Sequence, residues 1–502
     1  MAADITIAPC RDATLVARLS REAWREGVDS RSSGHRFSAD DAERLFQEGA
    51  VALVASDPHG SPVGSVLVVP GDSNGFGDSG GSGDMELTKL AVPQKDARRS
   101  GVGAALVEAA ADLASARGVT DLVLAVSVYQ PELCRYYANR GFTVVPGRAY
   151  RHASPHSPTP IVMVRSLVGA ARSDPIGAAA KALLDGRLVI IPTETVYGLG
   201  ALASDPVAVR RVFATKGRPV DHPLIVHVAN RRAIGHWARE VPDSARRLAE
   251  ALWPGPLTLV LPKARWVPFE VTGGLDTVAL RVPGHPEALA VLGLLPENSG
   301  IAAPSANRFG QVSPSTAQDA VADIGAHLMP GDLVVDGGPC RVGVESTIVD
   351  LTSSVPTILR PGGCPAEEIE AVLGGPVNRT ATGPSRAPGM LAAHYAPMAG
   401  VLVVDASRVG STLRSVSLTG QRVGLLGPES LVPSEPGVVL LEAPDPYDGA
   451  SLAPVLYSRL READRLGLDV LVVVATEDAG LGLAVNDRLR RAERGSRREA
   501  GL

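Results

Sequence analysis

The chain has 502 residues, of which 45% are hydrophobic, and its formal net charge is −5. This length exceeds what one hydrophobic core can organise and suggests about three domains. The acidic balance argues against strong non-specific binding of nucleic acid, which needs a basic surface, so any link to RNA should be indirect.

The four cysteines are Cys10, Cys134, Cys340 and Cys364, and they form neither a CxxC motif nor a spacing that pairs them with histidine. A disulfide framework and a zinc site are therefore not expected. The chain also shows no segment of signal-peptide character and no run of about eighteen apolar residues. We expect a cytoplasmic protein with reduced thiols and no contact with membrane.

The first part of the chain, to about residue 168, has the pattern of a separate α/β unit. Helical periodicity is expected at residues 12–24 and 39–48, and strands are expected at 50–56 and 63–70. The following segment, Gly71 to Asp84, is almost entirely Gly, Ser and Asp. It cannot bury a core and should form a mobile loop.

A glycine loop then joins a strand at Met85 to Val92 to an Ala- and Leu-rich helix that ends near Gly118. The loop reads RRSGVGA, from Arg98 to Ala104. Amides at the start of a helix can hold phosphate oxygens, because the helix dipole and the unsatisfied N–H groups both favour an anion. Small residues before a helix are also common for packing alone, so the loop by itself leaves both interpretations open.

The order of elements resembles that of GNAT acyltransferases: strand, RRSGVGA, long helix, the strand LVLAVSV, then ELCRYYANRGF. The resemblance implies that acetyl-CoA is the donor and that Tyr137 protonates the departing thiolate. Tyr136 and Tyr137 could instead only pack the helix. Glu86 is a candidate base, and the acceptor cannot be read from the sequence. The implied acetyl-CoA contacts are Leu90, Val92, Arg98, Arg99, Gly101, Gly103 and Ala104.

A second polar stretch follows the short apolar run LVIIP, where Thr193, Glu194 and Thr195 stand at the end of an expected strand. Open α/β sheets usually place ligands at such strand ends. A helix expected at residues 206–214 then leads into KGRP. Lys216 and Arg218 could neutralise a polyphosphate, the Lys as a point charge and the Arg as a planar fork. A solvated basic turn is the alternative.

Similar polar residues recur downstream at the ends of apolar runs. Together these stretches resemble the threonylcarbamoyl-adenylate synthase family, also called YrdC-type, from about Asp174 to Gly375. The motifs are PTETVYGLG, KGRPVDHPLIVHV, WPGPLTLVL, LRVPGHP, PSAN, ESTIVD and LRPG, in this order. The resemblance implies a twisted open α/β sheet. It also implies an enzyme that joins bicarbonate, L-threonine and ATP into threonylcarbamoyl-AMP, releasing pyrophosphate, for modification of a tRNA base next to the anticodon.

The resemblance also implies roles for individual residues. Lys216 and Arg218 would steady the triphosphate as catalytic residues. Mg²⁺ would be held by phosphates and water, since no carboxylate cluster is evident. His222 stands where the family commonly has Asn. The implied nucleotide contacts are Arg218, His222, Thr277, Ser305, Asn307, Ser313, Arg360 and Tyr395, and the implied L-threonine contacts are Thr195, His227, Arg281, Ala303 and Ser346.

The composition changes after Gly375. Residues 376–398 are rich in Pro, Ser and Thr, and composition alone would favour a disordered tether. However, PGMLAAHYAP resembles the linker of longer family members, which lies over the active site and supplies Tyr395. Residues 399–495 alternate strands and helices, typical of a small parallel, Rossmann-like α/β domain. The basic tail RLRRAERGSRRE, which begins at Arg488, is expected to be a solvated helix end.

The expected fold class is thus α/β multidomain. The expected bounds are a GNAT N-acetyltransferase-like domain at 1–168, a YrdC-type domain at 174–375, the linker at 376–398 and the last domain at 399–495. We expect a bifunctional enzyme whose adenylate product passes to a tRNA threonylcarbamoyl-transferase complex. Two alternatives stay open: an enzyme that carbamoylates a small molecule, and a non-catalytic YrdC module that binds nucleotide or RNA. The KGRP and SAN turns and the acidic balance argue against the non-catalytic module.

Overall fold

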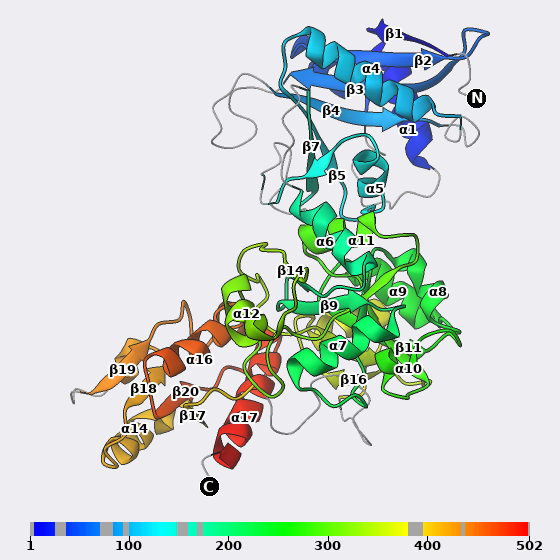
Figure 1. The fold of residues 1–502 in the computed structure, drawn as a ribbon. Coiled ribbons are helices and arrows are strands. Elements are labelled where there is room, and N and C mark those ends of the chain that lie inside the picture. Colours follow the sequence, from blue (N-terminus) through cyan, green and yellow to red (C-terminus); the bar gives the residue numbers. More distant parts are fainter. Residues whose placement is uncertain are drawn as a thin grey trace. The chain divides into compact units, whose positions relative to one another are not determined.

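The computed structural model describes residues 5–25, 37–70, 84–93, 100–146, 148, 159–167, 174–379, 395–432 and 437–499. The chain divides into two compact units, residues 1–178 with 289–295, and residues 179–288 with 296–502 (Figure 1). Within the described ranges, no helix is long and apolar enough to cross a membrane. The interpretations made for residues 71–83, Arg98 and Arg99 lie outside the described residues.

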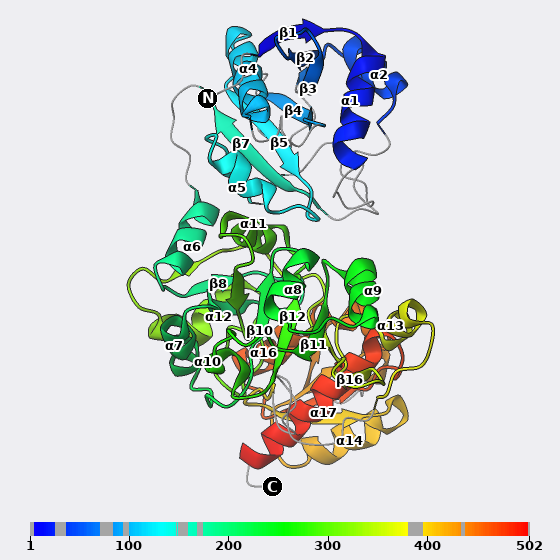
Figure 2. The ribbon, with the colours of Figure 1, turned by 90° about the vertical axis from the view of Figure 1, so that its right-hand side faces the viewer.

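The first unit is built on a twisted sheet in which the described strands follow the order β1-β2-β3-β4-β5-β7-β6. Leu67 and Val69 of β3 pack with apolar residues of α1 and α2, whereas α4 covers the opposite face (Figure 2). The bounds are β1 Thr6–Cys10, α1 Ala13–Arg25, α2 Ala39–Gln47, β2 Val51–Ser56, β3 Pro62–Pro70, β4 Asp84–Ala91, α4 Val102–Ala116, β5 Asp121–Val126, α5 Leu133–Ala138, β6 Thr143–Val144 and β7 Ile161–Ser166.

Strand β4 pairs with β5 along only part of its length. β4 pairs in parallel with β5 over Asp84 to Glu86 and antiparallel with β3 up to Ala91, with an irregularity near Leu67. The two parallel strands are therefore paired at one end of β4. The other end leads toward Gly101, which caps α4 in a left-handed conformation (φ 89°).

The second unit contains a mixed sheet whose described strands follow the order β14-β8-β9-β13-β10-β12-β11-β15-β16. The bounds are α6 Pro175–Leu184, β8 Val189–Ile191, β9 Gly198–Leu202, α7 Pro206–Lys216, β10 Ile225–Val228, α8 Ile234–Trp237, α9 Asp243–Leu252, β11 Leu257–Pro262, α10 Phe269–Thr272, β12 Thr277–Arg281, α11 Pro286–Leu294, β13 Gly300–Ala302, α12 Ala317–Ile324, β14 Leu333–Val334, β15 Thr347–Asp350, β16 Thr357–Arg360 and α13 Ala366–Leu373. The division into units assigns residues 175–178 of α6 and 289–294 of α11 to the first unit. The expected strand at LVIIP and the expected helix at 206–214 are confirmed.

Helix α7 has clear start and stop signals that fix the turn after it. Asp205 accepts hydrogen bonds from the amides of Val207 and Ala208, and Pro206 occupies the first helical turn. Gly217 ends the helix in a left-handed conformation (φ 64°), which a residue with a Cβ adopts at a cost. The helix therefore delivers Arg218 in a defined direction.

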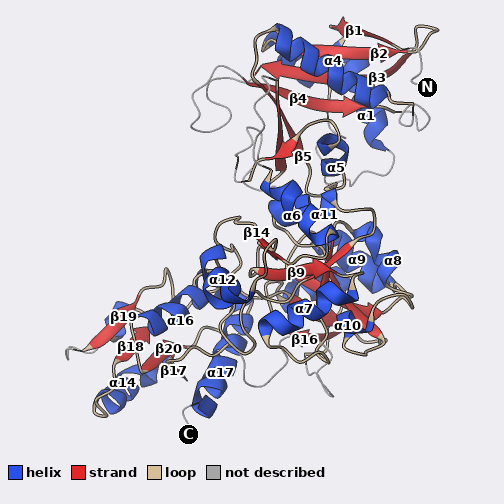
Figure 3. Ribbon diagram, in the orientation of Figure 1, coloured by secondary structure: helices blue, strands red, loops and turns tan. Residues whose placement is uncertain are grey.

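The remaining strands of the second unit form a four-stranded sheet in the order β17-β20-β18-β19. All pairings between these strands are parallel. Helix α14 packs against one face and α16 and α17 against the other (Figure 3). The expected parallel α/β domain is thus confirmed. The bounds are β17 Gly400–Val404, α14 Val409–Ser417, β18 Val423–Leu426, β19 Val438–Leu441, α15 Gly449–Leu452, α16 Leu456–Arg465, β20 Val470–Val474 and α17 Leu481–Glu499.

The apolar core of the four-stranded sheet also includes residues from the part of the unit that contains the larger, mixed sheet. Val196, Val312 and Val344 belong to the same buried apolar cluster as Leu456 and Leu489. These three valines lie in loops between the strands of the larger sheet, so loops of that part of the unit complete the apolar core of the four-stranded sheet.

Candidate active site

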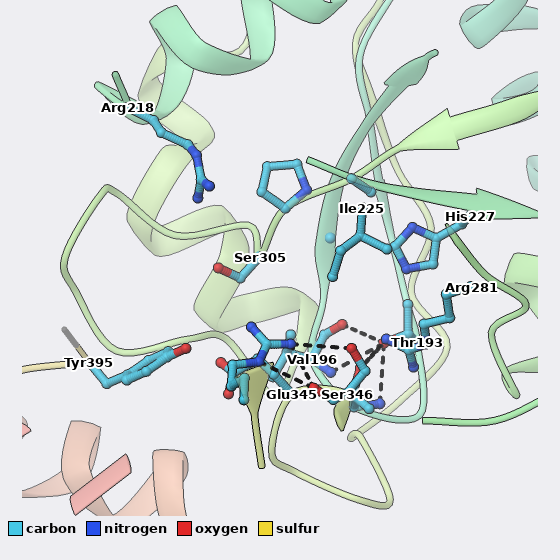
Figure 4. A pocket seen from close by; sticks show the side chains of 15 residues that line it. Thr193, Val196, Arg218, Ile225, His227, Arg281, Ser305, Glu345, Ser346 and Tyr395 are labelled. Atoms are coloured by element: carbon cyan, nitrogen blue, oxygen red, sulfur yellow. Dashed lines mark hydrogen bonds between the residues drawn. The ribbon is translucent and has the colours of Figure 1, made fainter. Parts of the chain in front are cut away.

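A pocket in the second unit gathers polar residues from many separate stretches (Figure 4). Most of these residues follow or end a strand, so the topology of the sheet brings them together. The pocket is lined by Thr193, Thr195, Val196, Gly198, Arg218, Ile225, His227, Arg281, Ala303, Pro304, Ser305, Glu345, Ser346, Arg360 and Tyr395. Nine of the fourteen residues expected to contact nucleotide or threonine, or to act as catalytic cations, are therefore at one place; that total omits Tyr137 and the acetyl-CoA contacts.

One end of the pocket is a buried hydroxyl and guanidinium network. Arg281 donates from Nη1 to the hydroxyl of Thr195 at 2.9 Å, and its Nη2 lies 2.7 Å from Oε1 of Glu194. The other oxygen of Glu194 accepts from the amide of Gly284 at 2.8 Å. A carboxylate fixed in this way holds the guanidinium in one orientation. Arg281 can thus present a fixed cation to a carboxylate ligand.

His227 stands beside Arg281 in this end of the pocket (Figure 4). Its side chain is buried, and burial together with the charge of Arg281 lowers its pKa to about 3. The imidazole is therefore neutral near pH 7 and can accept or donate one hydrogen bond at each nitrogen according to its tautomer. Nδ1 has no hydrogen-bond partner within the described part of the chain.

Arg218 points into the pocket from the side opposite His227 (Figure 4). Its Nη2 donates to the carbonyl of Pro223 at 3.1 Å, and its buried Nε has no partner among the described residues. Burial lowers the pKa of Arg218 to about 10, although Tyr395 acts in the other direction. The group stays charged at neutral pH, and its desolvated positive charge favours an anionic ligand.

Glu345 brings a negative charge to the same wall. The hydroxyl of Ser313 donates to Oε1 at 2.7 Å, and the hydroxyl of Tyr457 donates to Oε2 at 2.8 Å. Arg488 donates from Nε to Oε2 at 2.6 Å. Burial alone would raise the pKa of Glu345, but Arg488 and Arg360 lower it to about 2, so this carboxylate is ionised and paired.

Tyr395 completes the wall beside Glu345. Its backbone is left-handed (φ 64°), which is uncommon for a residue with a Cβ. Its ring stacks on that of Tyr457 at 5.9 Å between centroids, and the guanidinium carbon of Arg488 lies 5.3 Å from its centroid. Residues 380–394 of the expected linker lie outside the described residues.

The structure places some expected residues away from the pocket lining. Lys216 is buried, and its ammonium donates to the carbonyls of Ser305, at 2.5 Å, and Asn307. Asn307 in turn donates to the carbonyls of Arg308 and Gln311, at 2.7 and 2.8 Å. Both side chains therefore donate to backbone carbonyls in or just after the SAN turn and support its backbone.

His222 and Thr277 also lie outside the lining. The ring of His222 packs near Phe309 at 5.5 Å. Thr277 begins β12 and Arg281 ends it, so the two lie roughly 13 Å apart along the strand. Their direct contact with nucleotide stays a prediction.

Sequence reasoning missed four residues of the site network, and one of them is Tyr457, which donates to Glu345. Glu194 was noted as polar but given no role, and Glu345 stands in the ESTIVD motif, one residue before Ser346. Arg488 was expected to be solvated at a helix end, but it is fully buried. That interpretation was wrong because the tail is amphipathic: Leu489 is buried as well, and the side chain of Arg488 faces Glu345 rather than solvent.

In the first unit, the glycine loop and the tyrosine pair lie near each other. A Cβ on Gly103 would stand 2.6 Å from the hydroxyl of Tyr136. Tyr137 is buried against Phe142, with 5.8 Å between ring centroids, and burial raises its pKa. The hydroxyl of Tyr136 thus lies beside the loop. Leu90, Val92 and Ala104 are half-buried near the same end of β4.

Among the described residues, no group of three or more His, Cys, Asp or Glu side chains could hold a metal ion. The donors needed to chelate a divalent cation with protein ligands alone are thus not gathered in that part of the chain.

Three family models match the chain. Residues 181–362 match a model described as "Telomere recombination", and residues 364–493 match "Threonylcarbamoyl-AMP synthase, C-terminal domain". Residues 16–142 match the acetyltransferase (GNAT) family.

Curated relatives and solved structures agree with these matches. Threonylcarbamoyl-AMP synthase from Pyrococcus abyssi is 44% identical over 328 residues, which cover 63% of this chain and 93% of the relative. The enzyme from Bacillus subtilis is 38% identical over 333 residues and is covered to 94%. A crystal structure of P. abyssi Sua5 complexed with L-threonine has a TM-score of 0.59 and 42% identity, covering 64% of this chain and 94% of that one. The chain therefore belongs to the threonylcarbamoyl-AMP synthase family, and it carries a GNAT acetyltransferase domain before the synthase region.

Proposed function

We propose that the pocket of the second unit binds L-threonine and ATP side by side and joins them through bicarbonate into threonylcarbamoyl-AMP. The observation that carries this proposal is the convergence of Arg281, His227, Arg218 and Arg360 on one pocket. The two ends of the pocket differ in charge: Arg281 at one end is paired with Glu194, whereas Arg218 is a buried cation at the other. A substrate pair with one carboxylate and one triphosphate requires two such different ends.

We assign the threonine to the end that contains Glu194 and Arg281. Arg281 would pair with the substrate carboxylate, because Glu194 and Thr195 already fix its guanidinium. The neutral imidazole of His227 and the hydroxyls of Thr195 and Ser346 would bind the amine and the side-chain hydroxyl. Ala303 would contact the threonine methyl group. A complex of a relative with L-threonine is consistent with this assignment.

We assign the nucleotide to the end that contains Arg218 and Tyr395. Arg218 and Arg360 would neutralise phosphate oxygens, and Ser305 and Tyr395 would contact the nucleotide. Lys216 and Asn307 would act by holding the SAN turn, and Ser313 by holding Glu345. The proposal thus changes the expected role of Lys216 from a phosphate contact to support for Ser305. Mg²⁺ would be bound by the phosphates and water.

The reaction proposed has two bond-forming steps. The threonine amine attacks the carbon of bicarbonate, and loss of water leaves a carbamate. A carbamate oxygen then attacks the α-phosphorus of ATP, the bond to the β-phosphate oxygen breaks, and pyrophosphate leaves. The protein contributes positions and charges, and no covalent protein intermediate is needed.

Pyrophosphate release by the purified full chain tests this function. We expect release when ATP, L-threonine and bicarbonate are all present and only background release when either threonine or bicarbonate is omitted. Release that is independent of threonine would contradict the proposal. The supply of the adenylate to a tRNA threonylcarbamoyl-transferase, and the cytoplasmic location, stay predictions.

We further propose that the first unit binds acetyl-CoA through the amides that begin α4, at Gly101 and Gly103, with Arg98 and Arg99 adding charge. The observation that favours this is the partly separated pair β4 and β5 leading into a helix start. The proposed proton donor is Tyr137, but the geometry makes Tyr136 a second candidate because its hydroxyl lies by Gly103. The acceptor is unidentified.

A further inference from the structure

A buried ion pair joins the four-stranded sheet's helices to the wall of the synthase pocket. Glu345 lines the pocket and comes just before β15, whereas Arg488 belongs to α17. The Nε of Arg488 is 2.6 Å from Oε2 of Glu345, and the Arg488 side chain is fully buried. The two residues are 143 positions apart in the chain. The pair therefore depends on the folding of the C-terminal part against the rest of the second unit.

Arg488 is held in place by two further contacts. Nη1 donates to the carboxylate of Asp487 at 2.6 Å, and Nη2 donates to the carbonyl of Pro361 at 3.0 Å. Pro361 follows Arg360, which lines the pocket and donates to the carbonyl of Ser346 at 2.8 Å. The guanidinium thus connects α17 with two segments of the pocket wall.

The charge of Glu345 makes this connection important for a nucleotide site. A buried carboxylate at the wall would repel a triphosphate in a region of low dielectric. Arg488 and Tyr457 approach the carboxylate from α17 and α16, and Ser313 approaches it from a loop. Arg488 neutralises the charge, and the two hydroxyls occupy carboxylate lone pairs.

The same guanidinium lies beside Tyr395, 5.3 Å from the ring centroid. Tyr395 has a left-handed backbone, and such conformations persist where the surroundings determine them. Stacking on Tyr457 and the adjacent cation of Arg488 belong to these surroundings, as does the hydrogen bond from the amide of Ala396 to the carbonyl of Gly310 at 3.3 Å. Loss of Arg488 would therefore affect both the charge and the shape of the nucleotide end.

We propose that Arg488 is a positioning residue for the synthase reaction, which neutralises Glu345 and holds Tyr395 so that the pocket can accept the triphosphate of ATP. The C-terminal α/β part is then a structural part of the active site. This proposal rests on the proposed function of the pocket, because it requires that ATP bind beside Glu345.

The test compares kinetic constants of full-length variants in the pyrophosphate assay. Arg488→Met should raise the KM for ATP by roughly tenfold or more, because it removes the main cation that compensates the buried carboxylate of Glu345 and leaves Arg360 as the other one. The KM for L-threonine should change much less, since Arg281 and Glu194 are not part of this network. Arg488→Lys, which keeps the charge, should lie between Arg488→Met and the wild type.

A double variant and a matched control separate positioning from general destabilisation. Glu345→Gln combined with Arg488→Met should recover most of the loss in KM for ATP, because the uncompensated anion is gone. Arg461→Met removes a different contact between the same parts, in which Arg461 of α16 pairs with Asp323 at 2.6 Å and donates to the carbonyl of Val312 at 2.6 Å, and it should stay close to the wild type.

Three results would overturn the proposal. The first is an unchanged KM for ATP in Arg488→Met. The second is a double variant as impaired as Arg488→Met, which would place Glu345 itself in contact with substrate. The third is an equal loss in Arg461→Met, which would indicate a general effect of domain docking. If instead the wild type releases no pyrophosphate with threonine and bicarbonate, the proposed function fails, and this outcome is distinct from the other three.

Discussion

Arg218 is the cation whose environment most clearly requires a ligand. It lines the pocket, and its buried Nε has no partner among the described residues. We predict that Arg218→Ala lowers the rate of pyrophosphate release roughly tenfold or more, since one charge-assisted contact to phosphate is worth roughly 1.5–3 kcal/mol.

Arg210, in helix α7 just before Arg218, offers a matched control. Its side chain is 54% exposed and pairs with Glu270, so Arg210→Ala should leave the rate near that of the wild type. An Arg218→Ala enzyme as fast as Arg210→Ala would place Arg218 outside the reaction.

Glu194 determines the direction of Arg281 at the threonine end. We predict that Glu194→Gln raises the KM for L-threonine about tenfold while the KM for ATP changes little, because a tenfold change corresponds to about 1.4 kcal/mol, the scale of one weakened ionic contact. Initial rates at varied threonine measure this. Glu287→Gln is the control, since Glu287 is also buried but pairs with His285 at 2.7 Å. A rise in both KM values would mean that Glu194 supports the whole pocket.

Glu345 provides a pH-dependent contribution to stability. Its folded pKa of about 2 lies below its ordinary value of 4.5, owing to Arg488 and Arg360 acting against burial. The stabilisation is complete above pH 4.5 and is lost as the pH falls through 2. We predict that the wild type loses about 2 kcal/mol relative to Glu345→Gln between pH 5 and pH 3. Urea unfolding at both pH values measures this, and a constant difference would show that the carboxylate is not strongly paired.

At the scale of elements, the start of α4 carries the function proposed for the first unit. We predict that Gly103→Val abolishes binding of acetyl-CoA, because a side chain there meets the hydroxyl of Tyr136 and blocks approach to the helix amides. Calorimetry with acetyl-CoA on the wild type and the variant measures this. Pyrophosphate release by the synthase should be unaffected in the variant. Equal binding by both proteins would remove the loop from the coenzyme site.

Most elements could be predicted from the sequence because their periodicity is local. The strand at β8, the helix α7 and the parallel C-terminal sheet follow from apolar runs and from Pro and Gly at helix ends. Nine of the predicted pocket residues also lie together, because the family motifs place them at strand ends. Glu345 and Arg488 could not be paired in this way, since their contact joins segments that no local pattern relates.

At the scale of the whole second unit, the C-terminal part packs against loops that also form the pocket wall. Val196, Val312 and Val344 share a core with α16 and α17, and Arg488 and Tyr457 reach the pocket wall from those helices. The change of composition after Gly375 suggests separate domains. The shared apolar cluster and the Arg488–Glu345 pair nevertheless make the C-terminal part contribute to the shape and charge of the site. Linear arguments about composition do not reveal such docking.

The most direct measurement of the central claim is mass spectrometry of the product formed by the full chain from ATP, L-threonine and ¹³C-bicarbonate. The account predicts a threonylcarbamoyl-AMP ion that is one mass unit heavier than the ion formed from unlabelled bicarbonate, together with pyrophosphate. A product without the label, or AMP and pyrophosphate formed at the same rate without threonine, would contradict it.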